Sequence, residues 1–186
     1  MSIPDQLRDV IHRILWSDDS QEQGRIFTVI DAARDDTIYP EIVAADAEKT
    51  CLLVGEQAHQ LAPVAPYLIE LDEENPFTRW VLDHGWGKSW GIFVASTATF
   101  LELRHHFRKF LKVADEDGNT LFFRYYDPRV FRIFMPTCTE GQLQTVFGPV
   151  DRYFVEGEDD GTIIQYFLRG NNLVRNDIVL SEVTGE

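Results

Sequence analysis

Residues 120–135, with the sequence TLFFRYYDPRVFRIFM, contain a transition from strand to helix. The aromatic-rich first half, residues 120–126, predicts a strand. Asp127 followed by Pro128 predicts a helix start, because aspartate accepts hydrogen bonds from the free N–H groups of a first turn and proline has no N–H to leave free there. Apolar residues then recur at helical spacing until Pro136, which ends the helix.

The same alternation of strand and helix patterns extends along most of the chain. Short runs rich in β-branched and aromatic residues predict further strands over residues 25–30, 50–54, 67–71, 90–94, 150–155 and 162–169. Apolar residues at three- and four-residue steps predict helices over residues 5–16, 35–47, 76–84, 99–111, 128–135 and 139–147. This alternation predicts an α/β fold with a mixed β-sheet and flanking helices, arranged in one lobe or two.

The patterns divide the chain into three segments. Residues 1–24 predict an N-terminal helix and a polar loop, and residues 25–155 predict the core domain, with a polar turn at residues 115–119. Residues 156–186 contain the strand predicted at 162–169, after which the pattern fades from Gly170 onward. We therefore expect the last residues to form a tail.

Capping residues predict two more helix starts. Asn75 followed by a proline repeats the cap-and-proline arrangement, and Gly85 is the expected stop of that helix. Thr99 and Glu102 have the spacing of a capping box. The polar residues expected on the outward face of this second helix are Glu102, Arg104, His105, Arg108 and Lys109.

The composition is that of a folded, acidic protein. Of 186 residues, 44% are apolar and 26% are charged, close to the average for globular proteins. The 17 basic and 31 acidic residues leave a formal net charge of −14, which would repel phosphate backbones and anionic membrane surfaces. We therefore expect neither a nucleic acid nor a membrane as partner.

Three further observations favour a cytoplasmic location. The N-terminus lacks the basic and apolar regions of a secretion signal. The longest apolar run, residues 61–69, has nine residues with two prolines and is too short to cross a bilayer. The two cysteines, Cys51 and Cys138, cannot build a disulfide framework.

Charged and aromatic residues are unevenly distributed. Residues 79–132 carry nine basic and six acidic side chains, a net charge of +3, whereas the segments before and after them carry −11 and −6. Of the 23 aromatic residues, 14 lie between Phe77 and Phe134. An aromatic, mildly basic centre is typical either of a main core or of a partner-binding surface.

The string GKSWG at residues 87–91 matches the G-x-S-x-G motif of serine hydrolases. In those enzymes the serine lies on a turn from strand into helix, and an acid and a histidine follow it in the chain. Here a helix ends near Gly85 and a strand follows the motif, which is the reverse order. Only His105 and His106 follow Ser89, with no suitably placed acid between. The pattern favours a helix-to-strand connection over a catalytic serine.

Patterns for phosphate and metal sites are also incomplete. A P-loop needs a glycine where Leu82 stands, and the glycines of residues 85–91 do not fit a dinucleotide fingerprint. No pair of histidines has the spacing of a helical zinc site. We expect His84 in the core with one ring nitrogen bonded, and His105 and His106 at a helix surface and its edge. The sequence predicts no cofactor, no metal ion and no catalytic residues.

A series of motifs in a fixed order resembles one protein family. The motifs are APYLIEL at residues 65–71, NPF at 75–77, GWGKSWGIF at 85–93, RHHFRKF at 104–110, LFFRYYDPRV at 121–130 and FGPV at 147–150. Across roughly residues 25–154 their order is similar to that of the effector-adaptor family of bacterial type VI secretion, the Tap/TEC or VasW-like chaperones. Each motif alone is weak, but the combined order is fairly specific.

The resemblance implies a role that is not enzymatic. Proteins of this family hold a specific toxic effector in the cytoplasm of the producing cell and help load it onto the VgrG spike. The expected partners are therefore a secreted effector protein and VgrG. The family implies no cofactor and no catalytic residues.

Seven residues are assigned candidate roles. Asp127, Pro128 and Arg129 are interpreted as a fold-defining element, because the aspartate caps its helix and the arginine can pair with a nearby carboxylate. Aromatic residues and arginine are enriched in interface cores, so the candidate partner contacts are Trp86, Trp90, Arg104 and Arg108. The alternative for the two tryptophans is packing beneath the glycine-rich turn.

Two other classes of function stay open at this point. One is a small serine hydrolase that uses Ser89, and the other is an immunity protein that binds a toxin. An acidic inhibitor would suit a basic toxin, and the net charge of −14 permits that interpretation.

Overall fold

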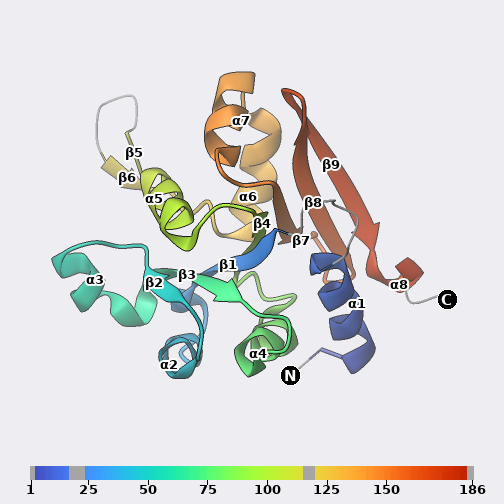
Figure 1. The fold of residues 1–186 in the computed structure, drawn as a ribbon, viewed down its shortest axis with the longest axis horizontal. Helices are drawn as coiled ribbons and strands as arrows, with labels where there is room; N and C mark the ends of the chain where they lie inside the picture. The colour runs from blue at the N-terminus through green and yellow to red at the C-terminus, as the bar shows by residue number, and fades with distance from the viewer. Residues whose placement is uncertain (1–2, 17–23, 115–119, 184–186) are drawn as a thin grey trace.

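The computed structural model describes residues 3–16, 24–114 and 120–183 and contains a seven-stranded and a two-stranded sheet (Figure 1). The strands are β1 (Arg25–Asp31), β2 (Lys49–Cys51), β3 (Pro66–Leu71), β4 (Gly91–Ser96), β5 (Lys112–Ala114), β6 (Thr120–Phe122), β7 (Arg152–Glu156), β8 (Thr162–Arg169) and β9 (Asn172–Val179). The α-helices are α1 (Asp5–Leu15), α2 (Ile38–Ala44), α3 (Glu56–Gln60), α4 (Pro76–Gly85), α5 (Phe100–Phe110), α6 (Pro128–Phe134), α7 (Glu140–Phe147) and α8 (Leu180–Val183). Single 3₁₀ turns are η1 (Ala32–Arg34), η2 (Ala62–Val64) and η3 (Met135–Thr137). The predicted α/β class with flanking helices is confirmed.

The larger sheet has the strand order β2-β3-β1-β4-β7-β8-β9. All of its described strand pairs are antiparallel, where we expected a mixed sheet. Strands β7, β8 and β9 follow one another in the chain and also pair in that order, as short connections between antiparallel strands allow. The C-terminal strands β8 and β9 therefore extend the larger sheet to one of its edges.

One face of this sheet supports three helices. In register across four strands lie Phe27, Val94, Tyr153 and Tyr166, so their side chains share a face. Phe131 of α6 packs on both tyrosines, with ring centroids 4.9 and 5.7 Å apart. Figure 1 shows α5, α6 and α7 on this side and α2 and α4 on the other side of β1, β3 and β4. The core therefore lies on both faces of the sheet.

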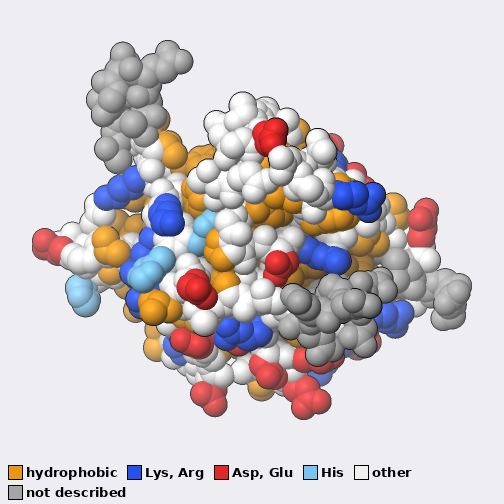
Figure 2. All heavy atoms as spheres, turned by 45° about the horizontal axis from the view of Figure 1, so that its top comes forward, with side chains coloured by type: hydrophobic (Ala, Val, Ile, Leu, Met, Phe, Trp, Pro, Cys, Tyr) orange, Lys and Arg blue, Asp and Glu red, His pale blue; other side chains and the backbone are white. Residues whose placement is uncertain are grey.

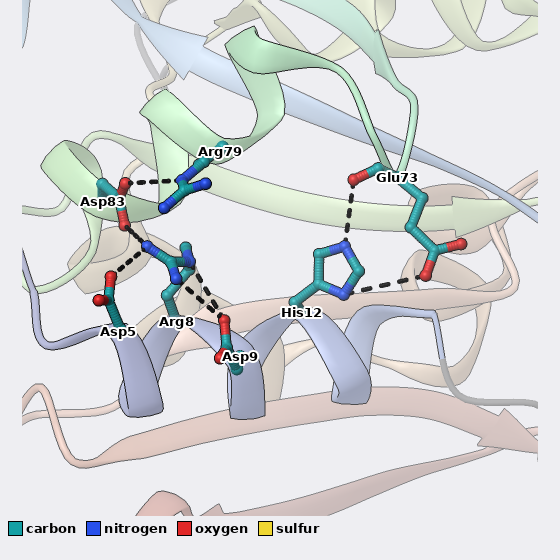
Figure 3. A network of polar contacts seen from close by, with 7 residues as sticks. All are labelled: Asp5, Arg8, Asp9, His12, Glu73, Arg79 and Asp83. Atoms are coloured by element: carbon teal, nitrogen blue, oxygen red, sulfur yellow. Dashed lines mark hydrogen bonds and ion pairs between the residues drawn. The ribbon is translucent and has the colours of Figure 1, made fainter.

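Helix α1 is attached to α4 by a charged cluster (Figure 3). The guanidinium group of Arg8 contacts Asp5 at 2.7 Å, Asp9 at 3.1 Å and Asp83 of α4 at 3.1 Å. Arg79 lies 3.7 Å from the other carboxylate oxygen of Asp83. These contacts connect the first described helix to a helix that packs on the sheet.

The strand predicted at residues 120–126 and the tail predicted after Gly170 differ from the structure. Within residues 120–126 only β6 is a strand, because the chain then turns inward and the Tyr125 hydroxyl donates to the Phe107 carbonyl at 3.0 Å. The tail expected after Gly170 is wrong, since β9 pairs with β8 along its whole length. Strand β9 is an edge strand with mostly exposed side chains, so its sequence lacks the apolar alternation of a half-buried strand.

Two predicted loops cannot be compared with the structure. The predicted polar loop falls mainly on residues 17–23, and the predicted polar turn falls on residues 115–119. Both lie outside the described residues.

Candidate functional site

The turn between α4 and β4 holds Ser89 in an unusual backbone conformation. Its φ is 54°, a left-handed value that few residues other than glycine adopt. Its N–H donates to the buried carboxylate of Glu156 at 2.9 Å. The chain passes from helix to strand here, as the sequence predicted, and not from strand to helix as in a nucleophile elbow. Among the described residues, no hydrogen bond joins Ser89 to a histidine.

Glu156 is a buried acceptor that sequence analysis missed. Burial raises its pKa to about 7, while backbone hydrogen bonds from Ser89 and Gly87 and the charge of Arg132 act in the opposite direction. The residue stands at the end of β7 and directly before an acidic loop, so its sequence context suggested a solvated carboxylate. Its contacts hold the glycine-rich turn against the sheet.

Trp86 and Trp90, two of the candidate partner contacts, are buried. The indole N–H of Trp86 donates to the Asp160 carbonyl at 2.8 Å, and the Trp90 ring lies 5.2 Å from that of Trp80. A Cβ at Gly85 would come within 2.8 Å of the Trp90 ring. Both rings fill the space beneath the turn, which is the packing role given as the alternative for these tryptophans, and their contact with a partner stays a prediction.

The predicted fold-defining element has the expected local geometry. Asp127 caps α6 by accepting a hydrogen bond from the Arg129 N–H at 3.0 Å, with Pro128 at the first helical position. The side chain of Arg129 also binds both oxygens of the same carboxylate. All three residues thus act on the start of one helix.

A second acid–arginine pair lies close to this cap. Asp31, at the end of β1, is buried and lies 3.8 Å from Arg124. Burial raises the pKa of Asp31, and the hydrogen bond from the Ala33 N–H and the charge of Arg124 oppose that shift. Arg124, which directly precedes Tyr125 in the LFFRYYDPRV motif, therefore partly compensates the buried carboxylate at the end of β1.

The histidines fit the sequence predictions only in part. His84 is half-buried and its Nδ1 lies 3.1 Å from the Trp80 carbonyl, as expected for a bonded core histidine. His105 is exposed on α5. His106 was expected at the edge of that surface but is buried, with Nε2 2.8 Å from the Val146 carbonyl of α7.

The outward side of α5 carries a cationic stripe. Its residues, here called the α5 face, are Leu101, Arg104, His105, Arg108 and Lys109. They recur at three- and four-residue steps, opposite the buried residues of the same helix. Leu101 is 49% exposed, and the two arginines are half-buried. The capping box predicted for Thr99 and Glu102 is present and orients the start of this helix.

The two arginines of the α5 face have no carboxylate partner among the described residues. The Nε atoms of Arg104 and Arg108 are inaccessible to solvent and lack hydrogen-bond acceptors. Arg108 donates one bond, from Nη2 to the Cys51 carbonyl at 2.9 Å. Burial and then the charge of Arg104 lower the pKa of Arg108. Like charges one helical turn apart destabilise a helix by about 0.2–0.5 kcal/mol, so this arrangement has a cost that an anionic partner would remove.

Exposed apolar side chains lie beside the α5 face. The β5–β6 hairpin follows α5 directly and exposes Val113, Leu121 and Phe122, the last of them by 54%. Lys112 Nζ lies 5.6 Å from the centre of the Phe122 ring. Figure 2 shows lysine, arginine and histidine side chains together with hydrophobic ones on the side of the molecule that carries α5 and α3. This mixture of cations and apolar groups is typical of protein interfaces.

The remainder of the described chain offers no comparable site. A cleft of about 1000 Å³ is lined by a mixture of apolar and charged residues, among them Trp16 and Gly24, which flank residues 17–23. Within the described ranges no three His, Cys, Asp or Glu side chains are placed to hold a metal ion. No helix in those ranges has the length and apolarity needed to cross a bilayer.

Comparison with known proteins gives one match. A family model with the description "Domain of unknown function (DUF4123)" matches residues 26–145, well over half of the chain. The matched segment includes the α5 face and the Asp127 cap and excludes α1, β7, β8 and β9. None of the curated proteins and none of the solved structures compared with the chain matches it.

Proposed function

The chain belongs to the family described as Domain of unknown function (DUF4123), and from this premise we propose that it is an adaptor chaperone for a type VI secretion effector. In this proposal it holds a specific toxic effector in the cytoplasm of the producing cell and helps load it onto the VgrG spike. The motif order that resembles effector-adaptors covers nearly the same residues as the family match.

The observation that carries the proposal is the α5 face. Arg104 and Arg108 lack carboxylate partners among the described residues although the chain has a net charge of −14. Strands β5 and β6, which follow the end of α5 in the chain, expose apolar residues. A macromolecular partner that covers this surface would supply the missing acceptors and bury the apolar groups.

Four of the motif residues have structural roles within the fold. Asp127, Arg129 and Arg124 make contacts within the fold, and Ser89 is held by its backbone N–H to Glu156. These four motif residues therefore have structural explanations that need no reaction chemistry.

Deletion of the gene in a producing strain tests the proposal. We expect secretion of one effector to be lost and to return when the chain is supplied again, while other cargo of the same apparatus is still secreted. An immunity protein would behave differently, because its loss would sensitise recipient cells and leave secretion intact. Unchanged secretion of every effector would contradict the adaptor proposal.

A further inference from the structure

We propose that the α5 face, together with the exposed residues Val113, Leu121 and Phe122 of β5 and β6, is the docking surface for an acidic, amphipathic segment of the effector. Carboxylates of that segment would pair with Arg104 and Arg108, and its apolar side chains would cover Leu101 and the exposed hairpin residues. This inference rests on the proposed function, because it names the part of the cargo that the adaptor recognises.

The positions of the two arginines define what can bind. They lie one helical turn apart on α5, so the matching carboxylates are also spaced about one turn apart, as at positions i and i+4 of a helix. Arg104 donates no hydrogen bond within the described residues, and Arg108 donates only to the Cys51 carbonyl. Both guanidinium groups therefore keep donors for a carboxylate, and a rotation of each would bring the unpaired Nε into a two-pronged contact.

Charge favours a peptide carboxylate over a phosphate polymer or lipid headgroup. The segments before and after the basic middle third carry net charges of −11 and −6. An extended polyanion that reached the α5 face would also pass these acidic parts and be repelled. A short acidic segment can bind the α5 face without passing over these acidic parts.

The hairpin supplies the apolar half of the surface. A two-stranded sheet is marginally stable in water unless a neighbouring element covers it. Val113, Leu121 and Phe122 are each at least 40% exposed, so the hairpin keeps apolar surface free beside the cations. An amphipathic segment fits this combination because it presents acidic and apolar side chains on adjacent faces.

The first test uses charge reversal in the full chain. The chain is co-expressed with the effector whose secretion the gene deletion abolishes, and the complex is measured by co-purification and titration. We expect Arg104→Glu with Arg108→Glu to weaken binding about thirtyfold or more, as loss of buried charge pairs does at interfaces. The matched control is Arg13→Glu with Arg169→Glu, which makes the same charge change at exposed sites on α1 and β8, away from α5 in Figure 1.

A second variant covers the case in which the half-buried arginines are needed for folding. Leu101→Asp with Lys109→Glu changes only exposed positions of the α5 face, so thermal melting should match the parent. We expect it to weaken effector binding as well. If both double variants fold and bind the effector as tightly as the control does, the inference is wrong while the adaptor proposal stands. If the parent itself does not bind the effector, the adaptor proposal fails and this inference fails with it.

A peptide probe tests the chemistry directly. The probe is an amphipathic helical peptide with glutamates at i and i+4 beside a leucine face, compared with the same peptide carrying glutamines. We expect the glutamate peptide to bind the parent in a salt-dependent manner and to lose binding to Arg104→Glu with Arg108→Glu. Equal binding of the two peptides would overturn the acidic part of the inference.

Discussion

Arg129 holds Asp127 through three hydrogen bonds at the start of α6. The backbone N–H and Nε of Arg129 donate to Oδ1 at 3.0 and 2.9 Å, and Nη2 donates to Oδ2 at 2.6 Å. Burial acts to raise the pKa of Asp127, but the hydrogen bonds and charge of Arg129 together outweigh it and lower the pKa. One carboxylate thus caps a helix and fixes the side chain of the arginine two residues later.

Asp127→Ala is expected to lower the free energy of unfolding by about 1 kcal/mol, the usual cost of a lost N-cap. Asp127→Asn serves as the comparison, because asparagine keeps a capping oxygen but loses the charge that binds Arg129. We expect its stability to lie between those of the parent and Asp127→Ala. Chemical denaturation measures the free energies of unfolding of the three proteins. Equal values for Asp127→Ala and the parent would show that the cap contributes nothing.

The buried His106 makes the stability of the fold depend on pH. Burial lowers its pKa from 6.5 to about 4, so the folded state favours the neutral ring that contacts the Val146 carbonyl. The contribution of a group with a lowered pKa is complete above its unfolded value and is lost as the pH falls toward the folded value. The window for His106 is therefore about pH 6.5 to 4.

As the pH falls through this window, we expect the parent to lose about 1.4 kcal/mol of stability per pH unit relative to His106→Gln. Denaturation curves of both proteins at pH 7, 6 and 5 give the difference at each pH. A constant difference across the series would mean that the ring titrates normally. The position tolerates little extra volume, because a Cβ at Gly148 would already come within 2.7 Å of the ring.

Glu156 is expected to act with the opposite sign. Burial raises its pKa from 4.5 to about 7, so the folded state favours the protonated acid. Its contribution is therefore complete below pH 4.5 and is lost as the pH rises through about 7.

Glu156→Gln mimics the protonated acid at every pH. We expect the stability of the variant relative to the parent to increase by about 1.4 kcal/mol per unit as the pH rises through this window. Comparing parent and variant at the same pH separates this effect from that of His106, whose window overlaps. A relative stability that does not change between pH 5 and 7.5 would contradict the assignment.

Local contacts explain which parts of the fold were predictable. The caps at Asn75, Thr99 and Asp127 depend on residues two or three positions away, so the sequence contains all the information that they need. Strand β9 depends on pairing with β8 and has an exposed, polar surface. Its assignment required the tertiary partner and not a local pattern.

Only part of the candidate site could be predicted from the sequence. The helical spacing of Arg104 and Arg108 places both on the outward side of α5, as expected. Burial of Trp86 and Trp90 depends on the path of the glycine-rich turn and on the distant Asp160 carbonyl. The exposed hairpin was missed because residues 120–126 have the aromatic content of a core strand.

Arg8 provides a test of how α1 is held, in a part of the chain outside the family match (Figure 3). Its side chain is 12% exposed among three aspartates, so Arg8→Met should lower the free energy of unfolding by about 2 kcal/mol through loss of charged hydrogen bonds. Arg79→Met is the matched control, because Arg79 contacts the same Asp83 but is 66% exposed, and its loss should cost at most about 1 kcal/mol. Hydrogen exchange should increase in α1 for Arg8→Met and stay unchanged in α5. Equal destabilisation by the two substitutions would mean that apolar packing, and not the charged cluster, attaches α1 to α4.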